Sequence, residues 1–260
     1  MGRWALRLVT IAILGFIYIP IGLVILFAFN SNRTASWPPA GFTLEWFVRA
    51  VESPGVRDAF RESLTAASGA TVISLVLGTL AALAVSRFRF FGRESVSFLV
   101  VLPIALPGIV TGIALNATFT TFDINLGMAT VIVGHATFCV VVVYNNVAAR
   151  LRRTSRSPEE ASGDLGAHAF ETFRWVTFPA IRTALLAGGL LAFALSFDEI
   201  IVTTFTAGPV QTLPIFIFRN IRLANQAPIV NVAAVFALLL SVIPVYVAQR
   251  LAGAESRSSR

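Results

Sequence analysis

Six long apolar runs constrain this chain more than any other feature of its sequence. They extend over residues 8–29, 63–85, 96–119, 127–147, 184–205 and 229–247. A helix needs about 20 predominantly apolar residues to cross the roughly 30 Å of hydrocarbon in a bilayer. Backbone polar groups in lipid must find their partners inside the spanning structure itself, and continuous apolar runs achieve this as helices. The sequence therefore predicts an all-α, polytopic membrane protein with six transmembrane helices.

The composition supports this class and argues against others. Of the 260 residues 56% are hydrophobic and 13% are charged, whereas about a quarter of a typical soluble domain is charged. A net charge of +7 would suggest a nucleic-acid partner in a soluble protein. Here every basic residue is an arginine, and the arginines cluster at the ends of apolar runs, where they orient the protein in the bilayer. We therefore expect contact with lipid and not with nucleic acid.

Few residues of this chain are suited to metal, redox or cofactor chemistry. Cys139 is the only cysteine, and His135 and His168 are the only histidines. A disulfide framework needs paired cysteines, and a typical protein metal site needs several such ligands close together. The sequence predicts no metal site and no cofactor.

The first apolar run has two interpretations. It follows Arg3 and Arg7 and is either a cleaved signal peptide or an uncleaved membrane anchor. The run is long for the hydrophobic region of a signal peptide, and Phe27-Ala28-Phe29-Asn30 offers no small-x-small cleavage site. These features favour the anchor.

The third apolar run contains Pro103 and Pro107, which lie four residues apart and so on one face of a helix. Proline removes a backbone donor and frees a carbonyl in the preceding turn. We expect a kinked helix at this point. The kink either lines a transport pathway or serves packing alone.

The longest strongly polar stretch between two apolar runs extends from Arg150 to Arg182. It begins with the pattern of a capping box, in which Ser157 is the N-cap, Pro158 the first helical residue and Glu160 the third. Gly166 suits the left-handed residue that closes such a helix. The stretch therefore predicts a short helix that ends at a glycine corner.

A second short helix is expected after that corner. It carries Phe170, Phe173 and Val176 on one side, and Glu171 and Arg174 form an i,i+3 ion pair. Phe178-Pro179 is expected to end it, because proline interrupts a helix.

These residues resemble the EAA motif of permease subunits from bacterial binding-protein-dependent ABC importers. That motif reads Glu-Ala-Ala, three residues, Gly, nine residues and Ile-x-Leu-Pro. Here the spacing is kept by Glu160-Ala161-Ser162, Gly166 and Val176-Thr177-Phe178-Pro179. Ser162, Val176 and Phe178 replace Ala, Ile and Leu. The alternative is an ordinary solvated helix pair that joins two spans.

The resemblance implies the type I ABC importer permease fold in a single transmembrane domain over residues 1–260. Residues 150–182 are then a cytoplasmic coupling loop that docks onto a separate ATPase. The residues expected to couple the two proteins are Glu160, Ala161, Ser162, Gly166 and Pro179.

The resemblance also implies partners for this chain. They are cytoplasmic ATP-binding subunits, a second and homologous permease subunit, and an extracytoplasmic solute-binding protein, all at a bacterial inner membrane. ATP hydrolysis is expected on the separate ATPase, so no catalytic residue is predicted here.

Two other classes of membrane protein are alternatives to an ABC permease. A secondary transporter often shows an inverted repeat with paired broken helices, and the sequence shows no such repeat. An intramembrane hydrolase would carry a motif such as G-x-S-x-G or H-E-x-x-H, and neither is present. Both classes are less well supported than the permease.

A second segment indicates which subgroup of this family the chain resembles. Residues 196–202, Ser-Phe-Asp-Glu-Ile-Ile-Val, are followed by Ala207-Gly208-Pro209 and Thr212-Leu213-Pro214. This segment is most similar to the second permease of spermidine/putrescine systems. Permeases for iron, thiosulfate, phosphonates or opines share similar segments and remain alternatives.

Asp198 and Glu199 are the only acidic residues inside an apolar run. An ionisable group within a span costs at least ~2.5 kcal/mol on insertion scales and is a functional candidate by default. On a continuous helix, Glu199 shares a small, polar face with Ser196 and Thr203. The four residues are therefore substrate-pathway candidates, with Glu199 facing the pathway and Asp198 a partnered residue at a helix or subunit contact. Alternatively, both carboxylates pair with Arg219 or Arg222 and only hold an outer loop.

The distribution of arginine predicts the orientation of the chain. Six spans put both termini on one side, and fourteen of the 20 arginines lie on that side, against six on the other. Arginine is enriched in cytoplasmic loops. A periplasm-dependent reporter fused after Arg156 is therefore expected to be inactive. Strong reporter activity would place the loop of residues 150–182 outside the cell and contradict the predicted orientation.

Overall fold

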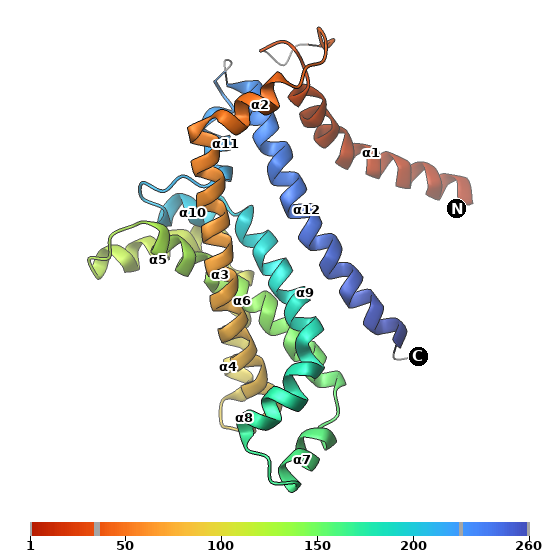
Figure 1. Ribbon diagram of the computed structural model, residues 1–260, viewed down its shortest axis with the longest axis vertical. Helices are drawn as coiled ribbons and strands as arrows, with labels where there is room; N and C mark the ends of the chain where they lie inside the picture. The colour runs from red at the N-terminus through yellow and green to blue at the C-terminus, as the bar shows by residue number, and fades with distance from the viewer. Residues whose placement is uncertain (1, 34–36, 224–225, 259–260) are drawn as a thin grey trace. The chain divides into compact units, whose positions relative to one another are not determined.

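The computed structural model describes residues 2–33, 37–223 and 226–258, in which the regular elements are helices (Figure 1). In chain order they are α1 (Arg3–Ala28), α2 (Glu45–Glu52), α3 (Pro54–Arg87), α4 (Arg93–Ala105), α5 (Gly108–Thr121), α6 (Met128–Arg153), α7 (Ser157–Asp164), α8 (Ala169–Thr172), the π-helical turn η1 (Phe173–Thr177), α9 (Phe178–Phe197), α10 (Ile201–Thr206), α11 (Leu213–Asn220) and α12 (Ala227–Ser258).

Within the described residues, five helices are long and apolar enough to cross a membrane. They are α1, α3, α6, the continuous helix Ala169–Phe197, and α12 as far as Arg250. A sixth span results if α4 and α5 count as one, although these two helices are bent by 105° where they meet. The predicted all-α, polytopic architecture is confirmed.

Several helices extend beyond the apolar runs. The run that starts at Ser63 lies inside α3, which already begins at Pro54, because proline suits the first turn of a helix. The polar tail predicted from Gln249 continues α12 as far as Ser258, and residues 259–260 lie outside the described residues.

The two predicted outer segments also contain helices. The segment of residues 30–62 includes α2, and residues 34–36 within it lie outside the described residues. The segment of residues 207–228 includes α11, and residues 224–225 within it also lie outside the described residues.

Contacts within the chain divide it into two units. The first comprises residues 1–61 and 212–239, and the second comprises residues 62–211 and 240–260. In the first unit, an apolar cluster joins Ala28, the α2 residues Trp46 and Ala50, and the α12 residues Val232 and Val235. The single domain expected over residues 1–260 stays a prediction.

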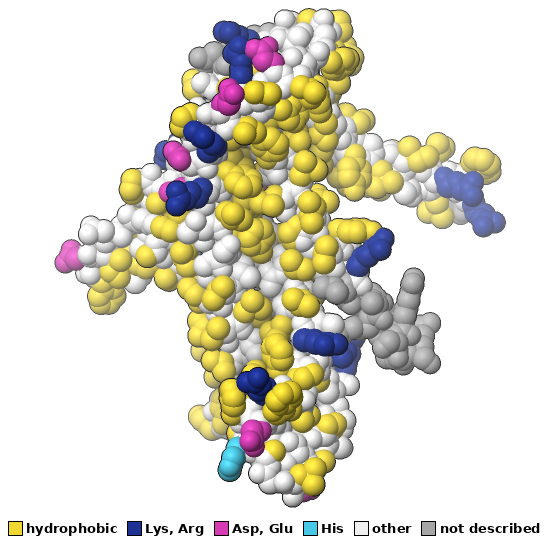
Figure 2. Space-filling model, viewed as in Figure 1, with side chains coloured by type: hydrophobic (Ala, Val, Ile, Leu, Met, Phe, Trp, Pro, Cys, Tyr) yellow, Lys and Arg dark blue, Asp and Glu magenta, His cyan; other side chains and the backbone are white. Residues whose placement is uncertain are grey.

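Large apolar side chains of α1 are exposed, as lipid-facing side chains are. Phe16 is 82% exposed and Ile11 is 66% exposed. Hydrophobic side chains also cover much of the molecular face shown in Figure 2. Soluble monomers rarely expose large continuous apolar patches, so this surface suits a bilayer or another membrane subunit.

The core of the second unit is built around α6. Cys139, Val143 and Val147 of α6 are fully buried in a cluster that includes Ala82 of α3 and Ile181 of α9. These side chains lie on the inner face of α6, whereas Val133 of the same helix is 46% exposed.

Gly78 lets α3 approach the backbone of α6 closely. A Cβ atom at Gly78 would lie 2.9 Å from the carbonyl oxygen of Val140 and 3.0 Å from the backbone nitrogen of Tyr144. Backbone atoms cannot rotate away as a flexible side chain can, so only glycine fits without separating the helices.

We expect Gly78→Leu to separate α3 from α6 and destabilise the second unit by about 1–3 kcal/mol, the usual cost of overpacking. The measurement is the midpoint of thermal unfolding of the purified protein in detergent. Gly22→Leu in α1 is the control, because a Cβ atom there meets nothing within 4 Å. Equal midpoints for the two variants would contradict this account of Gly78.

Candidate functional site

The loop of residues 150–182 has the predicted glycine corner. α7 ends at Asp164, and Gly166 has a φ of 86°, in the left-handed region that favours glycine. The N–H of Ala167 donates to the carbonyl of Ser162 at 3.1 Å and closes the turn. The left-handed conformation predicted for Gly166 is confirmed.

The first turn of α7 differs from the predicted capping box. Its N-cap is Arg156, and no side chain among the described residues caps the helix. The carbonyl of Arg156 accepts from the N–H groups of Glu159 and Glu160 at 2.9 and 3.0 Å. Ser157 was the wrong N-cap because it already lies inside the first turn, where its N–H donates to the Ser155 hydroxyl at 3.2 Å.

Phe178-Pro179 does not end a helix, which is a second correction. α8 continues through η1 into α9, and the N–H of Phe178 donates to the carbonyl of Phe173, five residues earlier. This π turn changes the hydrogen-bond register immediately before Pro179. Proline lacks an N–H, so a wider turn at this point lets the helix continue through it.

Glu171 has a different partner from the one predicted. Its Oε2 accepts from the N–H of His168 at 2.9 Å and so caps α8. The Arg174 guanidinium lies over the ring of Trp175, 5.2 Å from its centroid. The ion pairs found among the described residues do not include Glu171 with Arg174.

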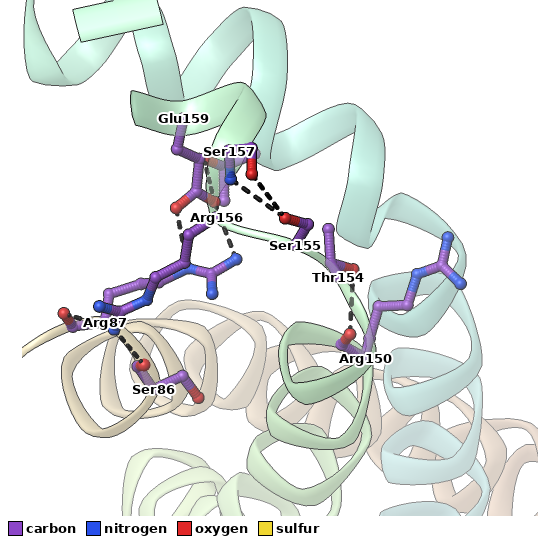
Figure 3. A network of polar contacts seen from close by, with 9 residues as sticks. Ser86, Arg87, Arg150, Thr154, Ser155, Arg156, Ser157 and Glu159 are labelled. Carbon is purple, nitrogen blue, oxygen red and sulfur yellow. Dashed lines mark hydrogen bonds and ion pairs between the residues drawn. The ribbon is translucent and has the colours of Figure 1, made fainter. Parts of the chain in front are cut away.

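A clamp between Arg87 and Glu159 attaches the loop to the end of α3 (Figure 3). Arg87 Nε lies 2.8 Å from Glu159 Oε2, and Arg87 Nη2 donates to Glu159 Oε1 at 3.0 Å. Thr177 of η1 donates its hydroxyl to the same Oε1 at 3.0 Å. The side chains of Arg87 and Glu159 are only 13% and 19% exposed. A charge-assisted arginine–carboxylate contact with little exposure is among the stronger polar contacts.

Arg156 reinforces this clamp from the other side (Figure 3). Its Nη2 donates to the carbonyls of Ser86 and Arg87 at 2.7 and 2.8 Å. These are among the last carbonyls of α3, which have no partner inside their own helix. The loop is therefore fixed to α3 by two arginines, one from each segment.

The predicted coupling residues divide into exposed and packed positions. Glu160 and Ala161 are exposed, and so are the large side chains of Leu165, Phe170 and Trp175, at 89%, 70% and 71%. The three large side chains, Leu165, Phe170 and Trp175, give the loop an apolar outer surface.

The hydroxyl of Ser162 instead lies 3.0 Å from that of Thr172 and joins the two halves of the loop. Pro179 lies in the first turn of α9. Glu159, which sequence reasoning passed over in favour of Glu160, is the glutamate that fixes the loop. No local pattern indicated it, because its partner Arg87 is 72 residues away.

Two helix breaks form a second candidate site. The first separates α4 from α5, with Pro103 inside α4 and Pro107 at the N-cap of α5. The predicted kink is thus a sharp turn of 105°. The second break separates α9 from α10 at Asp198, Glu199 and Ile200, so the single straight helix assumed for residues 184–205 is wrong.

Glu199 caps the helix that follows its own break. Its Oε1 accepts from the N–H groups of Ile201 and Val202 at 2.7 and 2.9 Å. These first N–H groups of α10 have no partner within the helix, and a carboxylate is favourable there. The other oxygen, Oε2, has no hydrogen bond or ion pair within the part of the chain that is described. Asp198 is exposed.

A cavity of about 170 Å³ lies where the two breaks meet. It is lined by Pro103, Ile104, Leu106, Gly108, Thr111, Phe138, Leu195, Glu199 and Val202. Its lining is mostly apolar, with the carboxylate of Glu199 as its one charged group. The hydroxyl of Thr111 is buried and has no hydrogen-bond partner among the described residues.

Ser196 and Thr203, two of the four pathway candidates, do not line this cavity. Both are buried, and their hydroxyls lie 2.7 and 2.8 Å from the ring nitrogens of His135 in α6. The break in the helix removes the common face that a continuous helix would have given them with Glu199. No local pattern indicates this role of His135, because Ser196 and Thr203 lie 61 and 68 residues away in the sequence.

We expect Arg87→Ala to release the loop from α3. The measurement is limited trypsin cleavage after Arg156 in the purified protein, because the protease must draw that side chain away from the carbonyls of Ser86 and Arg87. Breaking a polar contact of this kind should speed cleavage by about tenfold or more, since the loop then opens more often. Arg89→Ala removes an exposed neighbouring arginine and should leave the rate unchanged. Equal rates for both variants would show that the clamp does not hold the loop.

Known proteins resemble this chain in sequence and in fold. The family model described as "Binding-protein-dependent transport system inner membrane component" matches residues 74–255. Identity is 34% over 241 residues to the putrescine transport system permease protein PotI of Escherichia coli (strain K12), covering 88% of this chain and 85% of the relative. It is also 34% over 243 residues to the spermidine/putrescine transport system permease protein PotC of the same strain, covering 93% and 91%.

A solved structure shows the same fold. It is a bacterial ABC transporter involved in the import of the acidic polysaccharide alginate, with a TM-score of 0.70 at 17% identity over 95% of this chain and 94% of that one. The family model and the sequence relatives confirm the family inferred from the EAA motif, and the solved structure confirms its fold. The chain belongs to the binding-protein-dependent transport system inner membrane components, the multi-pass permeases of ABC importers.

Proposed function

We propose that this permease carries polyamines, and that the cavity where the two helix breaks meet forms part of their path. The observation that carries the proposal is the carboxylate of Glu199 in the lining of that cavity. Substrate sites in transporters are often built from discontinuous helices. The relatives named for putrescine and spermidine transport support the same class of substrate.

The chemistry of the cavity suits a polyamine better than an anion. A polyamine alternates ammonium groups with methylene segments, and the cavity offers one carboxylate within mostly apolar walls. An ammonium 4 Å from a carboxylate gains about 4 kcal/mol at an effective dielectric constant of 20. The same carboxylate repels thiosulfate and phosphonates, so these substrates fit less well.

The geometry of Glu199 leaves part of its carboxylate available to a ligand. Oε1 is occupied by two backbone N–H groups, which fixes the orientation of the side chain. Oε2 retains its capacity to accept a hydrogen bond from an ammonium group. Asp198 is exposed at the break and remains a candidate for a helix or subunit contact. Its pairing with Arg219 or Arg222 also stays a prediction.

The loop of residues 150–182 is proposed to couple transport to ATP hydrolysis on a separate subunit. Glu160 and Ala161 are placed at the contact, beside the exposed Leu165, Phe170 and Trp175. Gly166 shapes the corner, Ser162 joins the two halves of the loop, and Pro179 lies exposed in the first turn of α9. In this proposal the loop and both termini are cytoplasmic, as the arginine distribution predicts.

The complete transporter in this proposal has further subunits in and around the inner membrane. They are ATP-binding subunits below the loop, a homologous permease beside this chain, and an extracytoplasmic binding protein that delivers the polyamine. An enzymatic role is assigned only to the ATP-binding subunits.

We expect Glu199→Gln to lower polyamine uptake by about tenfold or more, equivalent to at least ~1.4 kcal/mol of lost interaction with the substrate. Glutamine keeps an oxygen that can cap α10, so this variant removes the charge and preserves the cap. The measurement is uptake of labelled putrescine and spermidine by the whole transporter at matched membrane expression.

Asp198→Asn is the matched control and should stay within about twofold of the unaltered protein, a difference below ~0.5 kcal/mol. Unchanged uptake in Glu199→Gln, Asp198→Asn and the double variant would remove the carboxylates from the pathway. A loss confined to Asp198→Asn would assign the pathway to the other carboxylate.

A further inference from the structure

A buried histidine joins the two helices on either side of the second break. His135 lies in α6 and is 1% exposed. Its Nδ1 lies 2.7 Å from the hydroxyl of Ser196 in α9, and its Nε2 lies 2.8 Å from the hydroxyl of Thr203 in α10. One imidazole ring therefore contacts both helices, and the non-helical residues 198–200 lie between the two contacts.

The hydrogen bonds around the ring fix its tautomer. The Thr203 hydroxyl donates its single proton to the carbonyl of Glu199 at 2.8 Å. It must then accept from His135, which places the imidazole proton on Nε2. In the neutral ring Nδ1 is then the acceptor, and the Ser196 hydroxyl donates to it. The result is a directed chain from Ser196 through neutral His135 and Thr203 to the backbone of Glu199.

Other contacts hold the far end of α10. Asn116 of α5 donates to the carbonyl of Phe205 at 2.7 Å, and Thr130 of α6 donates to the carbonyl of Thr206 at 2.7 Å. These contacts fix where α10 ends but do not reach its first residues. The start of α10 is held by the packing of Val202 in the core and by the polar contacts through His135.

We infer that His135 is a positioning residue, which sets the geometry of the α9–α10 break and thereby holds the Glu199 carboxylate at the cavity. The transport consequence of this inference rests on the proposed function. The geometric consequence does not, since it concerns the break itself. A histidine that merely filled space would be replaceable by any apolar side chain of similar size.

Two substitutions of His135 distinguish a hydrogen-bonding role of this side chain from a space-filling one. His135→Leu fills much of the space but can neither accept from Ser196 nor donate to Thr203. His135→Gln supplies an acceptor oxygen and a donor nitrogen on one side chain, so it can preserve both bonds. Tyr144→Phe is the control, because it removes a part-buried hydrogen bond that the same helix makes to Ser97 at 2.7 Å, away from the break.

The first experiment is independent of the substrate. Amide hydrogen exchange is measured in the purified transporter complex, in peptides that cover residues 198–206. We expect exchange about tenfold faster in His135→Leu, because local opening of α10 no longer breaks the bonds to His135. His135→Gln and Tyr144→Phe should both stay close to the unaltered protein. Unchanged exchange in His135→Leu, or equal increases with Leu and Gln, would overturn the inference.

Thr203→Val provides a second route if His135→Leu does not assemble. It removes the link to the carbonyl of Glu199 and leaves the ring in place. It should accelerate exchange in the same peptides, and unchanged exchange in this variant would also overturn the inference.

The second experiment asks whether His135 acts through Glu199. Polyamine uptake is compared for His135→Leu, Glu199→Gln and the double variant. If the histidine only positions that carboxylate, the double variant should transport as well as Glu199→Gln alone, whereas independent roles would multiply the two losses. Multiplied losses would overturn the positioning role. If exchange responds as expected but the unaltered complex carries no polyamine, the proposed function fails and the role of His135 in the break stands.

Discussion

The backbone groups freed at the helix breaks are the constraint on which the candidate site depends. A broken helix exposes N–H and carbonyl groups, and within a bilayer the protein has to satisfy most of them itself. At the break before α10, the N–H groups of Ile201 and Val202 are satisfied by Glu199. At its end, Asn116 and Thr130 satisfy two carbonyls. A short helix of six residues is thereby stable without continuing into α9.

This arrangement gives one carboxylate two tasks. Glu199 caps α10 with one oxygen and lines the cavity between the breaks with the rest of its side chain. The cap keeps the carboxylate in place without a basic partner among the described residues, and such a partner would neutralise it. An acidic group in a span is costly. The backbone N–H groups offset part of that cost while leaving the charge available.

The loop of residues 150–182 is held by a different kind of contact. Its corner is local, since Gly166 and the bond from Ala167 to Ser162 need no distant residue. Its attachment is not local, because Arg87 reaches Glu159 across 72 residues of sequence. The π turn at η1 then carries the loop into α9 without interruption. One continuous helix therefore connects the loop to the break that Glu199 occupies.

The sequence by itself determined the all-α membrane class, the glycine corner and the family, because hydrophobic run length, a left-handed residue and motif spacing are local properties. Only the tertiary structure decided where helices break and which side chains meet. The apolar run around Asp198 is long enough for one continuous helix and so gave no sign of a break, although the side chain that caps α10, Glu199, is only two residues from Ile201. The ion-pair partner of Glu159, Arg87, and the partners of His135 likewise lie 72 and at least 61 residues away. Such pairings arise from packing between distant helices, and no single helical pattern encodes them.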